Sequence, residues 1–311
     1  MTRATATTDF ALLAAADGAP LSQRLGAVYE LTKPRMNFLV LVTTAVGFLA
    51  AATPQALLDA VVGIAFLHVL FGTALSAAGA SVLNQLIERK ADAKMPRTRR
   101  RPLPAGLLSP TFAGVFGVLL CEVGVAYLAF FVNPLTALLS LLTILSYVAI
   151  YTPLKRKTPW CTAIGAIPGA IPPMMGVAAA TGGLDWLAVG LFGVLFAWQM
   201  PHFFGLATMY RDDYAAGGFR MLPGEANGVR RTAIQVVLYC LALLPLSVVP
   251  VLDGDIGWLY AIPAIGLGLW YLAAGIRMAR EGTRPAATKL FLVSIAYLPA
   301  MLAVLVLDAA L

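Results

Sequence analysis

Long apolar runs dominate this sequence and constrain its fold more than any other feature. A helix needs about 20 consecutive, mostly apolar residues to cross the roughly 30 Å hydrocarbon core of a bilayer. Only 12% of the 311 residues are charged, about half the share found in soluble domains. We therefore predict an all-α polytopic membrane protein, with about nine transmembrane helices in a single bundle. The expected spans are 37–53, 59–87, 107–131, 135–152, 160–180, 186–209, 232–252, 256–276 and 288–308.

The 22 Lys and Arg residues are confined to one set of loops. They lie before the first span, in every second loop after it, or at the adjoining helix ends. The alternate loops and the C-terminal end carry acidic residues instead, namely Asp59, Asp185, Asp253, Asp255 and Asp308. Because cytoplasmic loops are enriched in Lys and Arg, we expect the N-terminus in the cytoplasm and the C-terminus outside. The net charge of +7 then reflects topology, and we expect no nucleic-acid partner.

The first 30 residues differ in pattern from the rest of the chain. Their apolar piece, 10–16, is short for the core of a signal peptide, and Asp9 and Asp17 are untypical of a transit peptide. No later stretch is long enough to separate two domains. We predict a flexible cytoplasmic tail over 1–30 and a single transmembrane domain over 31–311.

Three oxygen-bearing side chains, Asn84, Glu88 and Asp92, recur every four residues at the cytoplasmic end of the second span. On an α-helix this spacing places them along one stripe. Mg²⁺ takes carboxylate oxygens and completes its shell with phosphate and water, and Arg97 and Arg101 in the basic stretch that follows offer forks that match phosphate. The pattern predicts a site for a metal-bridged diphosphate. The alternative is a solvated helix end with topogenic arginines, which suits the arginines better than Asn84 and Glu88.

Two further polar segments enter from the same side. Asp212 and Asp213 follow the sixth span, and adjacent aspartates on a helix point about 100° apart, so only one can face a shared metal. Taken alone, this segment fits a soluble loop equally well. Lys155 and Arg156 follow the fourth span, as additional diphosphate ligands or as topogenic charge.

His202 lies near the end of the sixth span, directly after Pro201. Proline kinks a helix and frees backbone carbonyls there. A ligand role toward a metal or a porphyrin iron competes with a plain packing role, and spacing alone slightly favours packing.

Together these motifs resemble the intramembrane prenyltransferases of the UbiA type and, within them, the protohaem IX farnesyltransferases. The resemblance implies a nine-helix bundle that transfers a farnesyl group from farnesyl diphosphate to a vinyl group of haem B, giving haem O for terminal oxidases. It also implies a bacterial inner membrane location, with the active site facing the cytoplasm. The motifs that carry it are Lys33-Pro34-Arg35, Asn84-x3-Glu88-x3-Asp92, Arg97-Thr98-x2-Arg101-Pro102-Leu103, Tyr151-Thr-Pro-Leu-Lys155-Arg156, Gln199-x-Pro201-His202 and Asp212-Asp213-Tyr214.

The resemblance assigns roles to individual residues. Those that would hold one or two Mg²⁺ ions are Asn84, Glu88, Asp92, Asp212 and Asp213, and the four acids among them would be catalytic. Those that would bind the diphosphate are Lys33, Asn84, Arg97, Arg101, Lys155 and Arg156, while His202 becomes a candidate for contact with haem. Membrane lipid, haem A synthase and oxidase assembly proteins are the further partners it suggests.

The sequence departs from the wider superfamily in its acidic motifs. Glu88 stands where an aspartate is frequent, and Tyr210 and Tyr214 stand where further aspartates are frequent, which leaves fewer carboxylates for a second metal. The alternatives are a related prenyltransferase with a quinone-precursor or chlorophyll-type acceptor, an anion transporter, and a non-catalytic oxidase assembly factor.

Overall fold

Helices form all of the regular secondary structure in residues 20–52 and 59–311, which the computed structural model describes. Within this part, nine helical segments are long and apolar enough to cross a membrane, which confirms the predicted fold class. They are α3 (Pro34–Ala51), α4 (Ala60–Asp92), α5 (Pro110–Phe131), α6 (Pro134–Ile144) continued by the π-helix η2 (Leu145–Tyr151) and α7 (Thr152–Leu154), α8 (Cys161–Thr181), α9 (Trp186–Met209), α11 (Gly228–Leu246) continued by η4 (Val249–Val251), α12 (Trp258–Glu281) and α13 (Arg284–Ala309). Three shorter helices are α2 (Leu21–Leu31), α10 (Arg211–Ala216) and η3 (Leu222–Gly224).

Local sequence signals set the ends of the spans. Pro110 and Pro134 each open a helix, where the missing N–H of proline has no helical partner to lose. Ser109 and Asn133 cap these two helices by accepting hydrogen bonds from backbone N–H groups in the first turn. The tight turn at Asn133 therefore separates two spans, as the sequence predicts.

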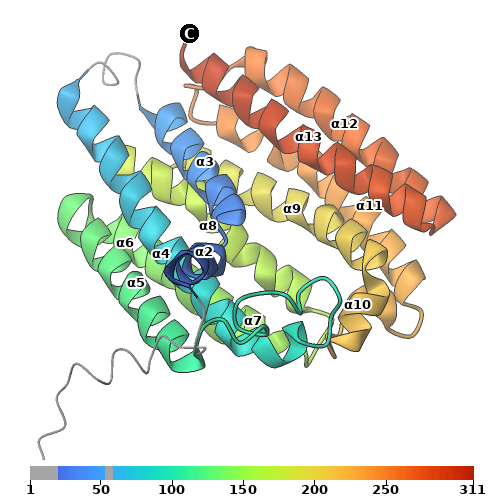
Figure 1. The fold of residues 1–311 in the computed structure, drawn as a ribbon. Coiled ribbons are helices and arrows are strands. Elements are labelled where there is room, and N and C mark those ends of the chain that lie inside the picture. Colours follow the sequence, from blue (N-terminus) through green and yellow to red (C-terminus); the bar gives the residue numbers. More distant parts are fainter. Residues whose placement is uncertain (1–19, 53–58) are drawn as a thin grey trace, which may run out of the picture.

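The spans form a closed bundle, because the last one packs against the first. Neighbouring contacts join α4 to α5, α5 to α6, α6 to α8, α8 to α9, and α9 to both α11 and α13, while α12 packs against α11 and α13. The first span, α3, packs against α4, α8 and α13 (Figure 1). The two most buried spans, α8 and α9, run through the middle of the bundle.

Two glycines let α3 and α8 approach closely. A Cβ atom on Gly176 of α8 would overlap the backbone oxygen of Thr44, and one on Gly47 of α3 would overlap the backbone oxygen of Pro173. Small residues at helix crossings in membranes allow such backbone contact. The path of α3 beside α8 depends on these positions having no side chain.

Replacing Gly176 with alanine is expected to lower the midpoint of thermal unfolding in detergent. The new methyl group meets backbone, which cannot turn aside as a side chain can, and overpacking of this kind costs about 1 to 3 kcal/mol. Gly266→Ala in α12 is the matched control, because its Cβ would have no atom within 4 Å. An unchanged midpoint in Gly176→Ala would show that α3 and α8 can separate freely.

The amphipathic helix α2 precedes the first span and is anchored to α4. Ala27 and Leu31 of α2 are buried against an apolar cluster that includes Val82, and Gln85 Nε2 donates to the Leu31 backbone oxygen at 2.8 Å. This helix lies within the segment predicted as a flexible tail, of which residues 1–19 lie outside the described residues. The division of the chain near residue 30 remains a prediction.

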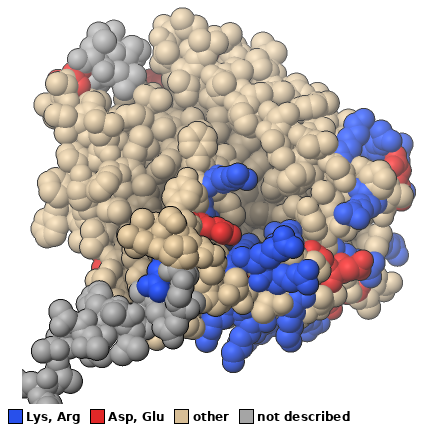
Figure 2. All heavy atoms as spheres, viewed as in Figure 1, with Lys and Arg blue, Asp and Glu red and all other residues tan. Residues whose placement is uncertain are grey.

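Basic side chains gather on one part of the surface. Figure 2 shows Lys and Arg over the lower and right-hand part of the molecule, with no basic residue visible at the upper left. This distribution agrees with the loop charges in the sequence, and it places the polar ends of α4 and α9 on the same side of the bundle.

Candidate active site

The end of α4 carries three buried polar side chains. The helix remains regular to Asp92, so Asn84, Glu88 and Asp92 occupy successive turns of one stripe. Their exposed fractions are 1%, 6% and 1%. Buried carboxylates are costly unless paired, so their partners define the site.

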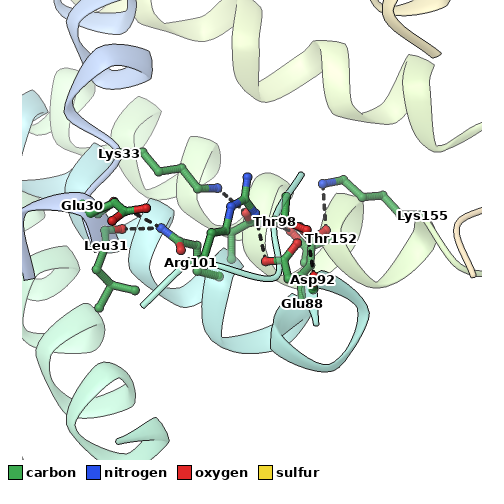
Figure 3. A network of polar contacts seen from close by, with 11 residues as sticks. Glu30, Leu31, Lys33, Glu88, Asp92, Thr98, Arg101, Thr152 and Lys155 are labelled. Carbon is green, nitrogen blue, oxygen red and sulfur yellow. Dashed lines mark hydrogen bonds and ion pairs between the residues drawn. The ribbon is translucent and has the colours of Figure 1, made fainter. Parts of the chain in front are cut away.

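Each of the three side chains is paired with a cation from a different segment (Figure 3). Lys33 Nζ donates to Asn84 Oδ1 at 2.6 Å, Lys155 Nζ lies 2.7 Å from Glu88 Oε1, and Arg101 Nη1 donates to Asp92 Oδ2 at 2.9 Å. Lys33 and Lys155 reach toward each other from opposite sides, over the end of α4. The structure therefore brings together six of the eleven residues predicted for the site: Lys33, Asn84, Glu88, Asp92, Arg101 and Lys155.

Local chain conformation positions Lys33 and Arg101. Lys33 adopts a left-handed conformation with φ of 50°, which is uncommon for a residue other than glycine and is often found at functional sites. It forms the boundary between α2 and α3. Thr98 Oγ1 donates to the Asp92 backbone oxygen at 2.9 Å, which turns the chain at the end of α4 so that Arg101 returns to Asp92.

Thr152, directly after a π-helix, is a residue of the site that the sequence did not predict. Thr152 Oγ1 accepts from Asn84 Nδ2 at 3.0 Å and donates to the Tyr147 backbone oxygen at 2.8 Å. The span was predicted as a plain helix, but residues 145–151 form a π-helix, a feature frequent at functional sites. Pro153 was the available signal, because a proline lacks the N–H that an α-helical ladder requires.

The two lysines differ in their electrostatic surroundings. Burial lowers the pKa of Lys33 to about 7, and the neighbouring positive charge of Arg101 acts in the same direction. Burial also acts to lower the pKa of Lys155, but the neighbouring Tyr151 and Glu88 outweigh it, so the net shift is upward. Lys33 faces a neutral amide and would gain from a bound anion, whereas Lys155 already has a carboxylate partner.

The second acidic motif lies on α10, at the edge of this network. Asp212 is exposed and Asp213 is half-buried, and neither side chain has an ion pair or hydrogen bond within the described chain. Among all the residues that the structure describes, no three or more His, Cys, Asp or Glu side chains form a cluster that could hold a metal ion. Metal binding by Asp212 and Asp213 thus remains a prediction.

Arg97 connects the two acidic motifs through aromatic rings. Its guanidinium carbon lies 5.2 Å from the ring centroid of Tyr210 and 6.0 Å from that of Tyr214, within range of a cation–π interaction. Arg156 is exposed and lies 6.0 Å from the ring centroid of Phe219. Arg97 and Arg156 are thus at the periphery of the network.

His202 lies apart from the paired cations and acids. Its Nδ1 is 2.7 Å from Ser294 Oγ on α13. Its ring stacks on Trp198 and packs against Phe291, at centroid distances of 5.0 and 4.8 Å. This aromatic setting between α9 and α13 is compatible with both interpretations of His202, and contact with haem remains a prediction.

The donor atoms at the end of α4 fit a hard divalent cation. Asp92 Oδ1 is buried and has no hydrogen-bond partner among the described residues. Its carboxylate lies one helical turn from that of Glu88, and both groups offer oxygen only. Mg²⁺ sites commonly use one or two carboxylates and take the remaining oxygens from phosphate and water. A metal held here would satisfy the unpaired oxygen of Asp92.

Comparison with known proteins gives consistent results for sequence and fold. The profile of the UbiA prenyltransferase family matches residues 40–295. A protohaem IX farnesyltransferase from Solibacter usitatus is 45% identical over 90% of this chain and 97% of its own length. One from Opitutus terrae is 44% identical, over 90% of this chain and 93% of its own.

Solved structures share the fold at low sequence identity. A digeranylgeranylglyceryl phosphate synthase superimposes with a TM-score of 0.75 at 18% identity, over 92% of this chain and 98% of the other. A UbiA homologue from Archaeoglobus fulgidus bound to GPP and Mg²⁺ gives a TM-score of 0.61 at 16% identity, over 90% and 99% of the two chains.

Proposed function

The chain belongs to the UbiA prenyltransferase family, and from this membership we propose that it transfers a farnesyl group from farnesyl diphosphate to a vinyl group of haem B, giving haem O. It is an integral membrane prenyltransferase. The close relatives named protohaem IX farnesyltransferase support haem B as acceptor over a quinone precursor or a chlorophyll-type ring. The family membership argues against an anion transporter and a non-catalytic assembly factor.

The observation that carries this proposal is the set of three polar pairs at one end of the bundle. Lys33, Arg101 and Lys155 bring cationic groups to the oxygens of Asn84, Asp92 and Glu88. The diphosphate group of a prenyl substrate needs both kinds of residue. The anion requires cations, and the metal that accompanies it requires carboxylates. The Archaeoglobus fulgidus homologue bound to GPP and Mg²⁺ supports the same pairing of ligand and metal.

Glu88 and Asp92, with Asn84 beside them, are the residues that would hold Mg²⁺. When bound, the metal would neutralise charge on the diphosphate and on these carboxylates. Asp212 and Asp213 are proposed as further ligands, for one ion or for a second one. Arg97 and Arg156 are proposed to contact the outer phosphate oxygens from the edge of the network.

The cations act on the leaving group. When the diphosphate binds, Lys33, Arg101 and Lys155 exchange their partners on α4 for phosphate oxygens. The side chains need to move little, because they already converge over the end of α4. As the carbon–oxygen bond breaks, its electron pair leaves with the diphosphate, and these groups stabilise the developing negative charge. The surrounding apolar helices exclude water from the allylic cation.

The acceptor completes the reaction. The vinyl carbon of haem B forms the new carbon–carbon bond to the farnesyl cation, and the positive charge passes to the carbon next to the porphyrin ring. Water adds there and loses a proton, which leaves the hydroxyl group of haem O. His202 and its aromatic neighbours are proposed to contact the porphyrin. We propose that the protein lies in a bacterial inner membrane with this site facing the cytoplasm, where haem A synthase and oxidase assembly proteins are candidate partners.

The direct test is an assay with defined substrates. Purified protein incubated with haem B, farnesyl diphosphate and Mg²⁺ is expected to produce a haem whose mass has increased by one farnesyl group and one hydroxyl group. Chelation of the metal is expected to lower the rate about 100-fold or more, and added Mg²⁺ is expected to restore it. A folded protein that prenylates a quinone precursor but not haem B would contradict the proposed acceptor.

A further inference from the structure

A pocket lies outside the candidate active site on the basic side, where α9 and α12 end and α11 and α13 begin. Its volume is about 170 Å³, and its lining includes Thr208, Arg211, Thr232, Met278 and Arg284. A shallower groove shares Arg211 with this pocket and extends past Arg230. None of these residues takes part in the network around Glu88 and Asp92.

The lining of this pocket carries positive charge and no carboxylate. Arg211, Arg230 and Arg284 form no ion pair within the described chain. Of the nearby carboxylates, Glu225 lines the groove and is bound by Arg220 at 2.8 Å, and Glu281 is bound by Arg277 at 2.7 Å. Asp212, next to Arg211 in the chain, has no ion-pair partner among the described residues. Arg211 and Arg284 therefore bring two guanidinium groups to the pocket, and Arg230 brings a third to the adjoining groove. Guanidinium groups match phosphate oxygens.

The start of α11 adds backbone donors to the same surface. Asn227 at its N-cap is left-handed, with φ of 55°, and its side chain makes no capping hydrogen bond. No backbone oxygen in the described chain accepts from the N–H groups of Val229 and Arg230, which line the pocket and groove. The uncapped N-terminus of a 19-residue helix favours an anion.

A buried hydroxyl provides an independent indication of a ligand. Thr232 lines the pocket and is 2% exposed, yet its Oγ1 has no hydrogen-bond partner among the described residues. Threonine in a helix commonly donates to the preceding turn, as Thr208 does to the Phe204 backbone oxygen at 2.8 Å. Leaving a buried hydroxyl unpaired is unfavourable, and a ligand oxygen in the pocket would satisfy it.

We propose that this pocket is a second anion site that binds a phosphate group, either in the headgroup of an acidic phospholipid or as free phosphate. The guanidinium groups, the first N–H groups of α11 and the Thr232 hydroxyl supply the donors. A headgroup is the favoured source, because the pocket lies at the ends of membrane-spanning helices on the basic side, where anionic headgroups gather. Arg211 also opens α10, so occupancy of the pocket would help to position the segment that carries Asp212.

The test compares lipid retention by variants of the full-length protein. Purified protein in zwitterionic detergent is mixed with phosphatidylglycerol, and bound lipid is counted by native mass spectrometry. The Arg230→Gln/Arg284→Gln double variant is expected to lose about 10-fold in retention, and Thr232→Val about 3-fold. The matched control, Arg99→Gln/Arg100→Gln, removes the same charge from an exposed loop on the same side and is expected to change retention less than about 2-fold.

A phosphate arm and a folding check complete the experiment. Titration with inorganic phosphate, followed by calorimetry, identifies the source: phosphate binding that depends on Arg230 and Arg284, without lipid retention, would make free phosphate the ligand and leave the site intact. Circular dichroism establishes that each variant is folded. Equal loss in the control variant, or no loss of either ligand in the double variant, would overturn the proposal.

Discussion

Replacing Asp92 with asparagine is expected to lower haem O formation about 1,000-fold or more while the protein remains folded in the membrane. The change removes one negative charge from the buried stripe and keeps the shape of the side chain. Asp92 combines an ion pair with Arg101 and a buried oxygen that has no hydrogen-bond partner among the described residues. Losing a preorganised electrostatic group of this kind costs about 100- to 1,000-fold in rate, and loss of the metal adds to that cost.

The measurement is the amount of haem O per mole of purified protein, determined by mass analysis. Asp255→Asn provides the control, because Asp255 is exposed in the turn before α12, far along the chain from the site. That variant is expected to retain full activity. Full activity in Asp92→Asn as well would remove the assignment of this stripe to catalysis. Asp212→Asn tests the second motif in the same assay, and its activity decides whether α10 contributes a metal ligand.

Replacing Lys155 with methionine is expected to reduce kcat/KM for farnesyl diphosphate about 100-fold. Methionine keeps most of the length of the side chain but lacks its charge. In this protein Lys155 forms the ion pair with Glu88 and lies 4.5 Å from the ring centroid of Tyr151. On the proposed mechanism Lys155 stabilises the charge that develops on the departing diphosphate, and losing one such preorganised group costs about 100- to 1,000-fold in rate.

Lys157→Met is the matched control for this change. Lys157 lies two residues away in the same basic loop, but its side chain is exposed. If basic charge near the membrane were all that mattered, both variants would lose the same activity. A specific diphosphate contact predicts a large loss for Lys155→Met and less than about a 2-fold loss for Lys157→Met. Similar losses in the two variants would contradict the proposed role of Lys155.

The sequence determined the membrane spans and the polar stripe on α4. Each expected span coincides with a helix of the structure, because the length of an apolar run is fixed by the thickness of the bilayer and does not depend on neighbouring helices. The stripe of Asn84, Glu88 and Asp92 followed from helical periodicity alone. The proposal of haem B as acceptor rests on similarity to known sequences, since no spacing rule distinguishes haem B from another ring.

The tertiary structure alone decided which side chains meet. Lys33 and Asn84 are 51 residues apart, and Lys155 follows a π-helix that shifts the register of its segment. Thr152 joined the site for the same reason, whereas Asp212 did not come into contact with the stripe. Periodicity tells which residues share a face of one helix, but the faces that meet depend on how the helices pack and turn. That is why the acids were found in the sequence, while the pairing of each with its own cation required the structure.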